Sequence, residues 1–329
     1  MQTIEIRGLT KVFNGTIRAV DNIDLTIKEG EIFGLLGPNG AGKTTTLSML
    51  STILNPTRGK ARVCGHDIVK DRNAVRHCIG IVFQDPSLDD ELTAMENLYF
   101  HGRLYGMTDG QIKDKGMEVL ALVELMDRKD SLVKTFSGGM KRRLEIARGL
   151  MHHPKVLFLD EPTLGLDPQT RRHLWDYIKK INEKEKMTII LTTHYMDEAD
   201  YLCNRIGIID KGRIIALDSS ERLKDVLGGD VITLQVSDTA KMKLLIEKLE
   251  CEKCVKKVDA FDGNLNVTIK DGGKNIPKIV QLAEKNDIKI DSVILKRPSL
   301  EDVFIHYTGR TIREEEPAKR RWRGGPHGR

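Results

Sequence analysis

Residues 32–44 read IFGLLGPNGAGKT, an apolar run followed by a glycine-rich loop that ends in lysine and threonine. The run predicts a buried strand, and the loop from Gly37 matches the phosphate-binding pattern GxxxxGK[ST]. Glycines let successive backbone N–H groups turn inward onto phosphates. Lys43 is then expected to reach the β- and γ-phosphates, and the Thr44 hydroxyl to ligate Mg²⁺. With a helix expected over 45–54, this stretch predicts an α/β protein that binds a nucleoside triphosphate.

A second apolar run, over 156–159, ends in the two acids Asp160 and Glu161. The pattern predicts a strand that is buried on both faces. We expect Asp160 to hold Mg²⁺ through water. We expect Glu161 to polarise the attacking water, because phosphoryl transfer needs an in-line nucleophile as well as charge neutralisation. The alternative interpretation is a solvated strand end.

Four further motifs lie elsewhere along the chain, and their order decides between the possible nucleotide-binding proteins. They are Gln84 after the strand-like run 79–83, Ser137-Gly138-Gly139 before a basic helix, Gly165-Leu166-Asp167, and His194 after the apolar run 188–193. Taken singly, each motif has a plain alternative, such as a loop before a helix or an ordinary surface or core residue. Taken in this order, they indicate one nucleotide site.

That order, over residues 2–228, resembles the nucleotide-binding subunit of an ATP-binding-cassette (ABC) transporter. The resemblance implies a P-loop NTPase fold with a RecA-like core, an antiparallel β subdomain and a helical subdomain. It also implies that Ser137 to Gly139 form the signature motif, Gln84 the Q-loop, 165–167 the D-loop and His194 the switch histidine. Family signatures usually read Leu-Ser-Gly-Gly-Gln, and here Phe136 and Met140 replace the outer two residues.

The resemblance assigns residues to ATP, to Mg²⁺ and to catalysis. The expected catalytic residues are Lys43, Glu161 and His194, and the expected Mg²⁺ ligands are Thr44, Gln84 and Asp160. The expected ATP contacts are Phe13, which stands where such proteins stack an aromatic ring on adenine, with Gly37, Pro38, Asn39, Gly40, Ala41, Gly42, Lys43, Thr44, Thr45, Gln84, Ser137, Gly138 and Gly139.

The signature motif also predicts a dimer. A helix N-terminus presents unpaired N–H groups and partial positive charge, which suit a γ-phosphate. In the family, this motif faces the phosphate held by the other subunit. Two ATP molecules are then sandwiched between two identical or closely related cassettes, and neither subunit has a complete site alone.

Composition and hydropathy agree with a cassette whose membrane channel is a separate polypeptide. The chain has 329 residues, 40% hydrophobic and 31% charged, with no run near the ~18 apolar residues of a spanning helix. Residues 1–10 lack a signal-peptide core, and five scattered cysteines suit a reducing cytosol. The pair Cys251 and Cys254 could bind a metal or act in redox chemistry, or could be two small residues at a helix end.

Between Gln84 and Ser137 the apolar period is helical, which predicts the helical subdomain. By resemblance, residues 85–107, with Tyr99, Phe100 and Tyr105, contact the membrane subunit. The alternative is that these aromatic side chains pack the core of the subdomain. Because the resemblance implies contact with a membrane subunit, the protein is expected at the cytoplasmic face of the cell membrane.

After residue 228 a second pattern begins, in the order βαββαβ, which predicts a small ferredoxin-like domain over 229–308. Its ending, Arg297 to Phe304, resembles the C-terminal extension of the daunorubicin and multidrug-resistance exporter group. We expect this domain to fold separately, to regulate or stabilise assembly, and to contribute nothing to the chemistry. The alternative is a structural cap over apolar surface on the cassette. The basic segment 309–329 reads as a disordered tail.

The sequence therefore predicts a Mg²⁺-dependent ATPase that powers export of drugs or antibiotics through a separate membrane subunit. Alternatives are a cassette for ion, lipid or polysaccharide efflux, a soluble regulatory ATPase, or a module that binds nucleotide without hydrolysis. Glu161 and His194 argue against the last of these. Two cassettes or a long heptad insertion would favour the regulatory class, and the sequence has neither, so no specific nucleic-acid partner is expected.

Overall fold

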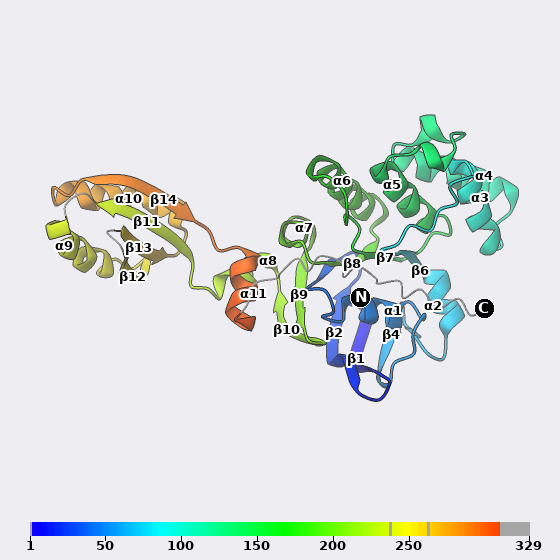
Figure 1. Cartoon of the computed structure of the whole chain (residues 1–329), viewed down its shortest axis with the longest axis horizontal. Helices are drawn as coiled ribbons and strands as arrows, with labels where there is room; N and C mark the ends of the chain where they lie inside the picture. The colour runs from blue at the N-terminus through cyan, green and yellow to red at the C-terminus, as the bar shows by residue number, and fades with distance from the viewer. Residues whose placement is uncertain (1, 237–238, 262–263, 310–329) are drawn as a thin grey trace, which may run out of the picture.

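The computed structural model describes residues 2–236, 239–261 and 264–309, which form three β-sheets flanked by helices (Figure 1). The central sheet has the order β10-β9-β3-β8-β7-β6, and all its neighbours are parallel except β9 and β10. Its strands are β3 (Ile32–Leu36), β6 (Ile79–Val82), β7 (Val156–Asp160), β8 (Thr188–Thr193), β9 (Arg205–Asp210) and β10 (Arg213–Asp218).

The central strands β3, β7 and β8 are buried at every residue, as parallel strands covered on both faces are. Alternate side chains supply two cores. Leu157 and Leu159 point to one, and Val156 and Phe158 to the other. These strands therefore confirm the strands expected over 32–36, 156–160 and 188–193.

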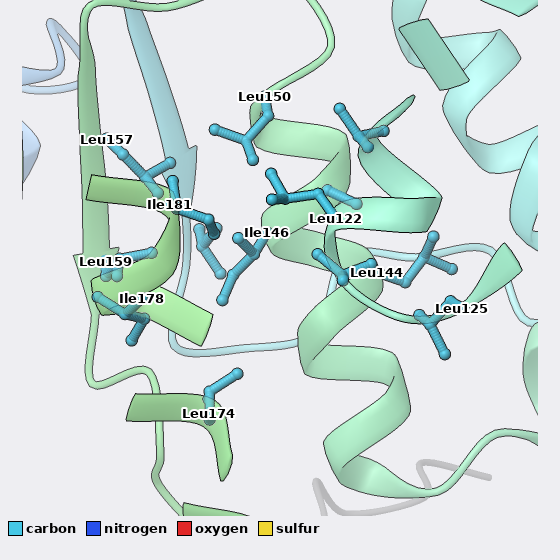
Figure 2. Close-up of a cluster of buried hydrophobic side chains, with 14 of the residues drawn as sticks. Leu122, Leu125, Leu144, Ile146, Leu150, Leu157, Leu159, Leu174, Ile178 and Ile181 are labelled. Atoms are coloured by element: carbon cyan, nitrogen blue, oxygen red, sulfur yellow. The ribbon is translucent and has the colours of Figure 1, made fainter. Parts of the chain in front are cut away.

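Two helices, α5 (Gly138–Gly149) and α6 (Pro168–Glu185), lie on one face of the central sheet, and α3 (Ala94–Leu104) and α4 (Asp109–Leu122) pack against α5 (Figure 1). Short 3₁₀ turns lie over Met126–Arg128 and Val133–Thr135. Figure 2 shows the core where Ile146, Ile178 and Ile181 meet Leu157 and Leu159. Thr93 and Thr108 each start a helix with a capping box. The threonine hydroxyl accepts from the backbone N–H three residues later, and the side chain of that residue accepts from the threonine N–H. The expected helical subdomain is present.

The other face carries the antiparallel sheet β2-β1-β4-β5 and the helices α1 (Lys43–Leu50) and α2 (Arg72–Cys78). The strands are β1 (Gln2–Phe13), β2 (Ile17–Lys28), β4 (Arg58–Val63) and β5 (His66–Asp67). The helix expected over 45–54 begins two residues earlier and ends at Leu50. It stops there because Ser51 caps it and Thr52 takes a left-handed backbone, φ +66°.

The third sheet has the order β12-β13-β11-β14, with every neighbouring pair antiparallel. Together with two helices it gives the order βαββαβ of a ferredoxin-like fold, as expected. The elements are β11 (Asp230–Val236), α9 (Thr239–Glu250), β12 (Val255–Phe261), β13 (Asn264–Ile269), α10 (Gly272–Lys285) and β14 (Ile290–Lys296). Its core is its own, built around Leu234, Leu265 and Ile279.

The last described helix, α11 (Leu300–Thr308), leaves this third sheet and packs on the cassette (Figure 1). Its neighbours are α7 (Met196–Leu202) and α8 (Ser220–Asp225). Leu300, Val303 and Phe304 form one apolar face, which is buried against Leu36 and Leu223. Residues 300–308 therefore differ from the expectation of one separate unit over 229–308, because their apolar stripe covers the cassette. The expected tail lies outside the described residues from position 310.

Among the helices in the described part of the chain, none is long and apolar enough to cross a membrane.

Candidate nucleotide-binding site

The phosphate loop joins β3 to α1 and lines a cleft of about 920 Å³. Two of its glycines are required by their surroundings. A Cβ on Gly37 would lie 2.2 Å from the Ile209 carbonyl oxygen, and Gly42 has a φ of +105° with the Ala19 carbonyl 2.3 Å from a Cβ position. The curled shape of the loop therefore requires glycine at both positions.

Lys43 is buried at the floor of this cleft. Its Nζ donates to the carbonyl oxygens of Gly37 (2.7 Å) and Pro38 (3.2 Å) and lies 3.2 Å from Glu161 Oε1. Burial lowers the pKa of Lys43, while the adjacent Glu161 carboxylate opposes that change. The ammonium group is therefore held in place by the loop itself.

Asp160 ends β7 and is buried beside two threonine hydroxyls. Thr44 Oγ1 donates to Asp160 Oδ1 at 3.1 Å, and Thr192 on β8 donates to the same oxygen. Burial raises the pKa of Asp160, and these two hydrogen bonds act in the opposite direction. The cluster offers only oxygen atoms, the donor type that Mg²⁺ prefers.

Glu161 has a strained backbone, with φ +46°, and is one of the few non-glycine residues in the left-handed region. Its N–H donates to the backbone and hydroxyl oxygens of Thr192, at 3.1 and 3.0 Å. This turn points the carboxylate into the cleft, where Oε2 lies 3.0 Å from His194 Nδ1. The contact is close, but it is not aligned as a hydrogen bond.

The charge state of Glu161 follows from these neighbours. Burial acts to raise the pKa of Glu161, but His194 and the Lys43 ammonium together outweigh burial and lower that pKa. The carboxylate is therefore ionised at neutral pH, as a proton acceptor must be.

Arg142 is a site residue that the sequence pattern does not distinguish from the other basic residues of its helix. Its guanidinium is buried and donates to the carbonyl oxygens of Phe83 (2.6 Å), Asp160 (2.9 Å) and Pro162 (2.8 Å). It also pairs with Glu145 at 2.8 Å. The hydrogen bonds of Arg142 thus connect α5, which begins at the signature motif, to the two loops that carry Gln84 and Glu161.

The structure brings together most of the predicted site residues. Those lining the cleft are Pro38, Asn39, Gly40, Gly42, Lys43, Thr44, Thr45, Gln84, Glu161 and His194. Ala19, Leu164 and Tyr195 also line it. Leu164 and Tyr195 adjoin predicted motifs, directly before Gly165 and directly after His194, whereas Ala19 had no such signal. Phe13, at the end of β1, is not among the described residues that line the cleft, and its ring lies 5.2 Å from Lys11 Nζ.

The signature residues lie elsewhere on the same chain. Ser137 caps α5 and accepts a hydrogen bond from Met140 N–H at 3.3 Å. Ser137 and Gly139 line a second pocket, together with Arg143 and Tyr177. A Cβ on Gly139 would meet Thr170 at 2.4 Å, so the glycine is needed for packing against α6. One chain therefore presents the phosphate loop and the signature motif in separate hollows.

Comparison with known proteins identifies the family. Residues 20–164 match the family described as ABC transporter, and residues 219–308 match the C-terminal domain of DrrA1-3-like ATP-binding proteins. The chain is 41% identical to the daunorubicin/doxorubicin resistance ATP-binding protein DrrA of Streptomyces peucetius, over 94% of this chain and 93% of that protein. It is also 41% identical to the linearmycin resistance ATP-binding protein LnrL of Bacillus subtilis, over 94% and 100%. The chain belongs to the ATP-binding subunits of ABC transporters.

Solved structures agree with this family. An ATP-binding cassette in a dimeric post-hydrolysis state, bound to ADP and Pi, matches with a TM-score of 0.58 and 29% identity, over 66% of this chain and 98% of that one. The ABC cassette fold, the ATP-binding function and the ATPase activity expected from the sequence are thereby confirmed. The resemblance to the daunorubicin-resistance group is confirmed as well.

Proposed function

We propose that this ABC ATPase, as a dimer of cassettes, drives the export of a drug or antibiotic through a separate membrane subunit. Two relatives at 41% identity over most of the chain are named for resistance to daunorubicin, doxorubicin or linearmycin. The match to the C-terminal domain of the DrrA1-3-like proteins supports the same assignment. Residues 2–228 form the cassette in this proposal, and the third sheet is an accessory unit.

The observation that carries the proposed hydrolysis of ATP is the position of Glu161. Its ionised carboxylate stands in the cleft between Lys43 and His194, at 3.2 and 3.0 Å. Glu161 accepts a proton from the attacking water, Lys43 binds the β- and γ-phosphates, and His194 holds Glu161 in position. The other cleft-lining loop residues contact the phosphates, and Phe13 contacts adenine.

Mg²⁺ fits the oxygen cluster beside the phosphate loop. Thr44 and Gln84, which line the cleft, would ligate the ion in this proposal, and Asp160, the partner of the Thr44 hydroxyl, would hold it through water. When bound, Mg²⁺ supplies positive charge that neutralises the phosphate oxygens. The buried Asp160, whose pKa burial raises, gains from such a cation because a positive charge favours the ionised carboxylate.

A second copy of the chain completes the site. Ser137, Gly138 and Gly139 stand at the N-terminus of α5, away from the cleft of their own chain. In the proposed dimer, they bind the γ-phosphate held by the partner's loop. ATP then joins the two cassettes, and its hydrolysis lets them separate.

The membrane subunit contacts the outer face of α3 in this proposal. Phe100 and Leu104, one helical turn apart, are 62% and 69% exposed, and Tyr99 is 42% exposed. Tyr105 differs, because its ring stacks on His152 at 3.8 Å and helps to join α3 to the core. Exposed apolar residues in adjacent positions are typical of a protein contact.

Transport by membrane vesicles tests this function. Inside-out vesicles that contain the tagged chain and its co-purifying membrane subunit should accumulate daunorubicin or linearmycin when ATP is added. Vesicles with Glu161→Gln should assemble equally well and accumulate neither drug. ATPase activity in the wild-type vesicles, without uptake of either drug, would contradict the proposed cargo class.

A further inference from the structure

A carboxyl group that the proposed mechanism does not use is buried in the helix that follows His194. It belongs to Glu198 on α7, and both Glu198 and Thr163 are 0% exposed. Glu198 Oε1 accepts hydrogen bonds from Thr163 Oγ1 at 2.8 Å and from Trp175 Nε1 on α6 at 3.0 Å. Burying a polar group is unfavourable unless it is hydrogen-bonded, so these two donors fix the Glu198 side chain.

The hydrogen bond with Thr163 joins the two chain segments that carry Glu161 and His194. Thr163 lies two residues after Glu161, and Glu198 lies four residues after His194. At the other end of these segments, Glu161 Oε2 lies 3.0 Å from His194 Nδ1. The two segments are therefore in contact twice, once in the cleft and once in the protein interior.

Both segments are short and are fixed by hydrogen bonds of their own backbone. Leu164 N–H donates to the Glu161 carbonyl at 3.2 Å, and Ala199 N–H donates to the Tyr195 carbonyl at 3.3 Å. A strained backbone such as that of Glu161, φ +46°, persists only where the surroundings fix it. The hydrogen bond from Thr163 to α7 is one of the contacts that hold this turn.

Trp175 makes an independent contact with the same oxygen of Glu198. It lies on α6, which packs beside α7 (Figure 1). Arg171 of α6 also contacts the segment after His194, because its guanidinium lies 3.9 Å from the centre of the Tyr195 ring. The hydrogen bond from Trp175 thus holds α7 against α6, but it does not include the segment of Glu161.

We propose that Glu198 is a positioning residue of the ATPase reaction, which holds the segments of Glu161 and His194 together through its hydrogen bond with Thr163. This role rests on the proposed function of Glu161 as the proton acceptor. Glu198 is not among the described residues that line the cleft, so it acts through Glu161 and His194. Because a misplacement of about 1 Å can lower a rate by about 10², loss of the contact should slow hydrolysis while the phosphate loop still binds ATP.

Thr163→Val and Trp175→Phe test the proposal as a matched pair, because each removes one of the two donors to Glu198 Oε1. Thr163→Val should lower kcat for ATP hydrolysis by the full chain at least about tenfold, with ATP affinity by calorimetry near that of the wild type. Trp175→Phe also removes buried volume, yet it should keep kcat within about twofold of the wild type. Wild-type kcat in Thr163→Val, or an equal loss in both variants, would overturn the proposal.

Substitution of Glu198 itself supplies a conservative variant. Burial raises the pKa of Glu198, while the hydrogen bonds from Thr163 and Trp175 oppose that change, and the balance favours the neutral acid. Glu198→Gln keeps an acceptor oxygen without a charge and should retain kcat within about threefold, whereas Glu198→Ala should lose about tenfold or more. Equal losses in the two variants, with folding confirmed by thermal melting, would contradict the assignment.

The Glu161→Gln background separates positioning from a general loss of structure. With the base removed, Thr163→Val should lower the residual turnover by less than about twofold, because Glu161 no longer accepts the proton. The same loss as in the wild-type background would show that Thr163 acts independently of Glu161 and would overturn the proposal. Wild-type turnover in Glu161→Gln alone would instead refute the proposed function of Glu161.

Discussion

At the scale of single residues, Glu161 shows why the site is built from a strained turn. A strand end would direct this side chain along the sheet, whereas φ +46° directs it between Lys43 and His194. Strain of this kind persists only where the surroundings fix it, here through two hydrogen bonds from Glu161 N–H to Thr192. The position of Asp160 and Glu161 at the end of an apolar run predicted a role for each carboxylate. It did not predict which side chains would surround them.

The first prediction concerns proton transfer. Glu161→Gln keeps the size and the hydrogen-bonding capacity of the side chain but removes the base, so ATP turnover should fall by about 10² or more. ATP affinity, measured by calorimetry, should stay near that of the wild type, because the loop and Lys43 are unchanged. Lys43→Ala is the matched control and should weaken ATP binding itself. Wild-type turnover in the glutamine variant would exclude Glu161 as the base.

At the scale of elements, the strands and helices of the cassette were predictable because their apolar periods are long and regular. The end of α1 was predicted wrongly, since the left-handed Thr52 is not visible in the pattern. A cover over the apolar surface of the cassette was left open as an alternative for the whole C-terminal segment, and α11 is the element that forms such a cover. Apolar residues every three to four positions indicate that Leu300, Val303 and Phe304 share one face of a helix. The pattern does not indicate which surface that face covers.

The second prediction tests the packing of α11. Phe304 is fully buried against the cassette, so Phe304→Ala should lower the free energy of unfolding by about 3–5 kcal/mol. Tyr307 on the same helix is 41% exposed, and Tyr307→Ala should change the same quantity by less than about 1 kcal/mol. Urea titrations of both variants measure the difference. Equal effects would show that α11 does not cover the cassette in solution.

The third prediction concerns the joint between α3 and the core. Burial, aided by the charges of Arg148 and His152, lowers the pKa of His101 from 6.5 to about 4. In the unfolded chain His101 binds a proton near pH 6.5, and in the folded chain only near 4, so stability is lost as the pH falls between these values. His101→Gln should lose less stability than the wild type from pH 7 to pH 4, by chemical denaturation. His66→Gln, on an exposed histidine, should follow the wild type, and a wild-type slope in His101→Gln would contradict the cause given.

At the scale of the whole molecule, the proposed dimer requires each chain to hold halves of two different sites. The cleft contains the phosphate loop, Glu161 and His194, while Ser137 and Gly139 line a separate pocket. The motifs alone predicted both halves, and the family resemblance predicted their use in a dimer. The physical reason for the separation is that α5 packs with α3, α4 and α6 on one side of the central sheet, whereas α1, which follows the phosphate loop, packs with the antiparallel sheet on the other side.

The most direct test is nucleotide retention by mixed dimers in a Glu161→Gln background, where hydrolysis is blocked. Gly138→Asp places a carboxylate against the partner's γ-phosphate, and Lys43→Ala removes the phosphate-binding charge. Each variant alone should release labelled ATP during gel filtration. Their mixture should retain it, because one of the two interfaces then has both defects and the other has neither. Full retention by Gly138→Asp alone, as a monomer, would show a complete site within one chain and contradict the account.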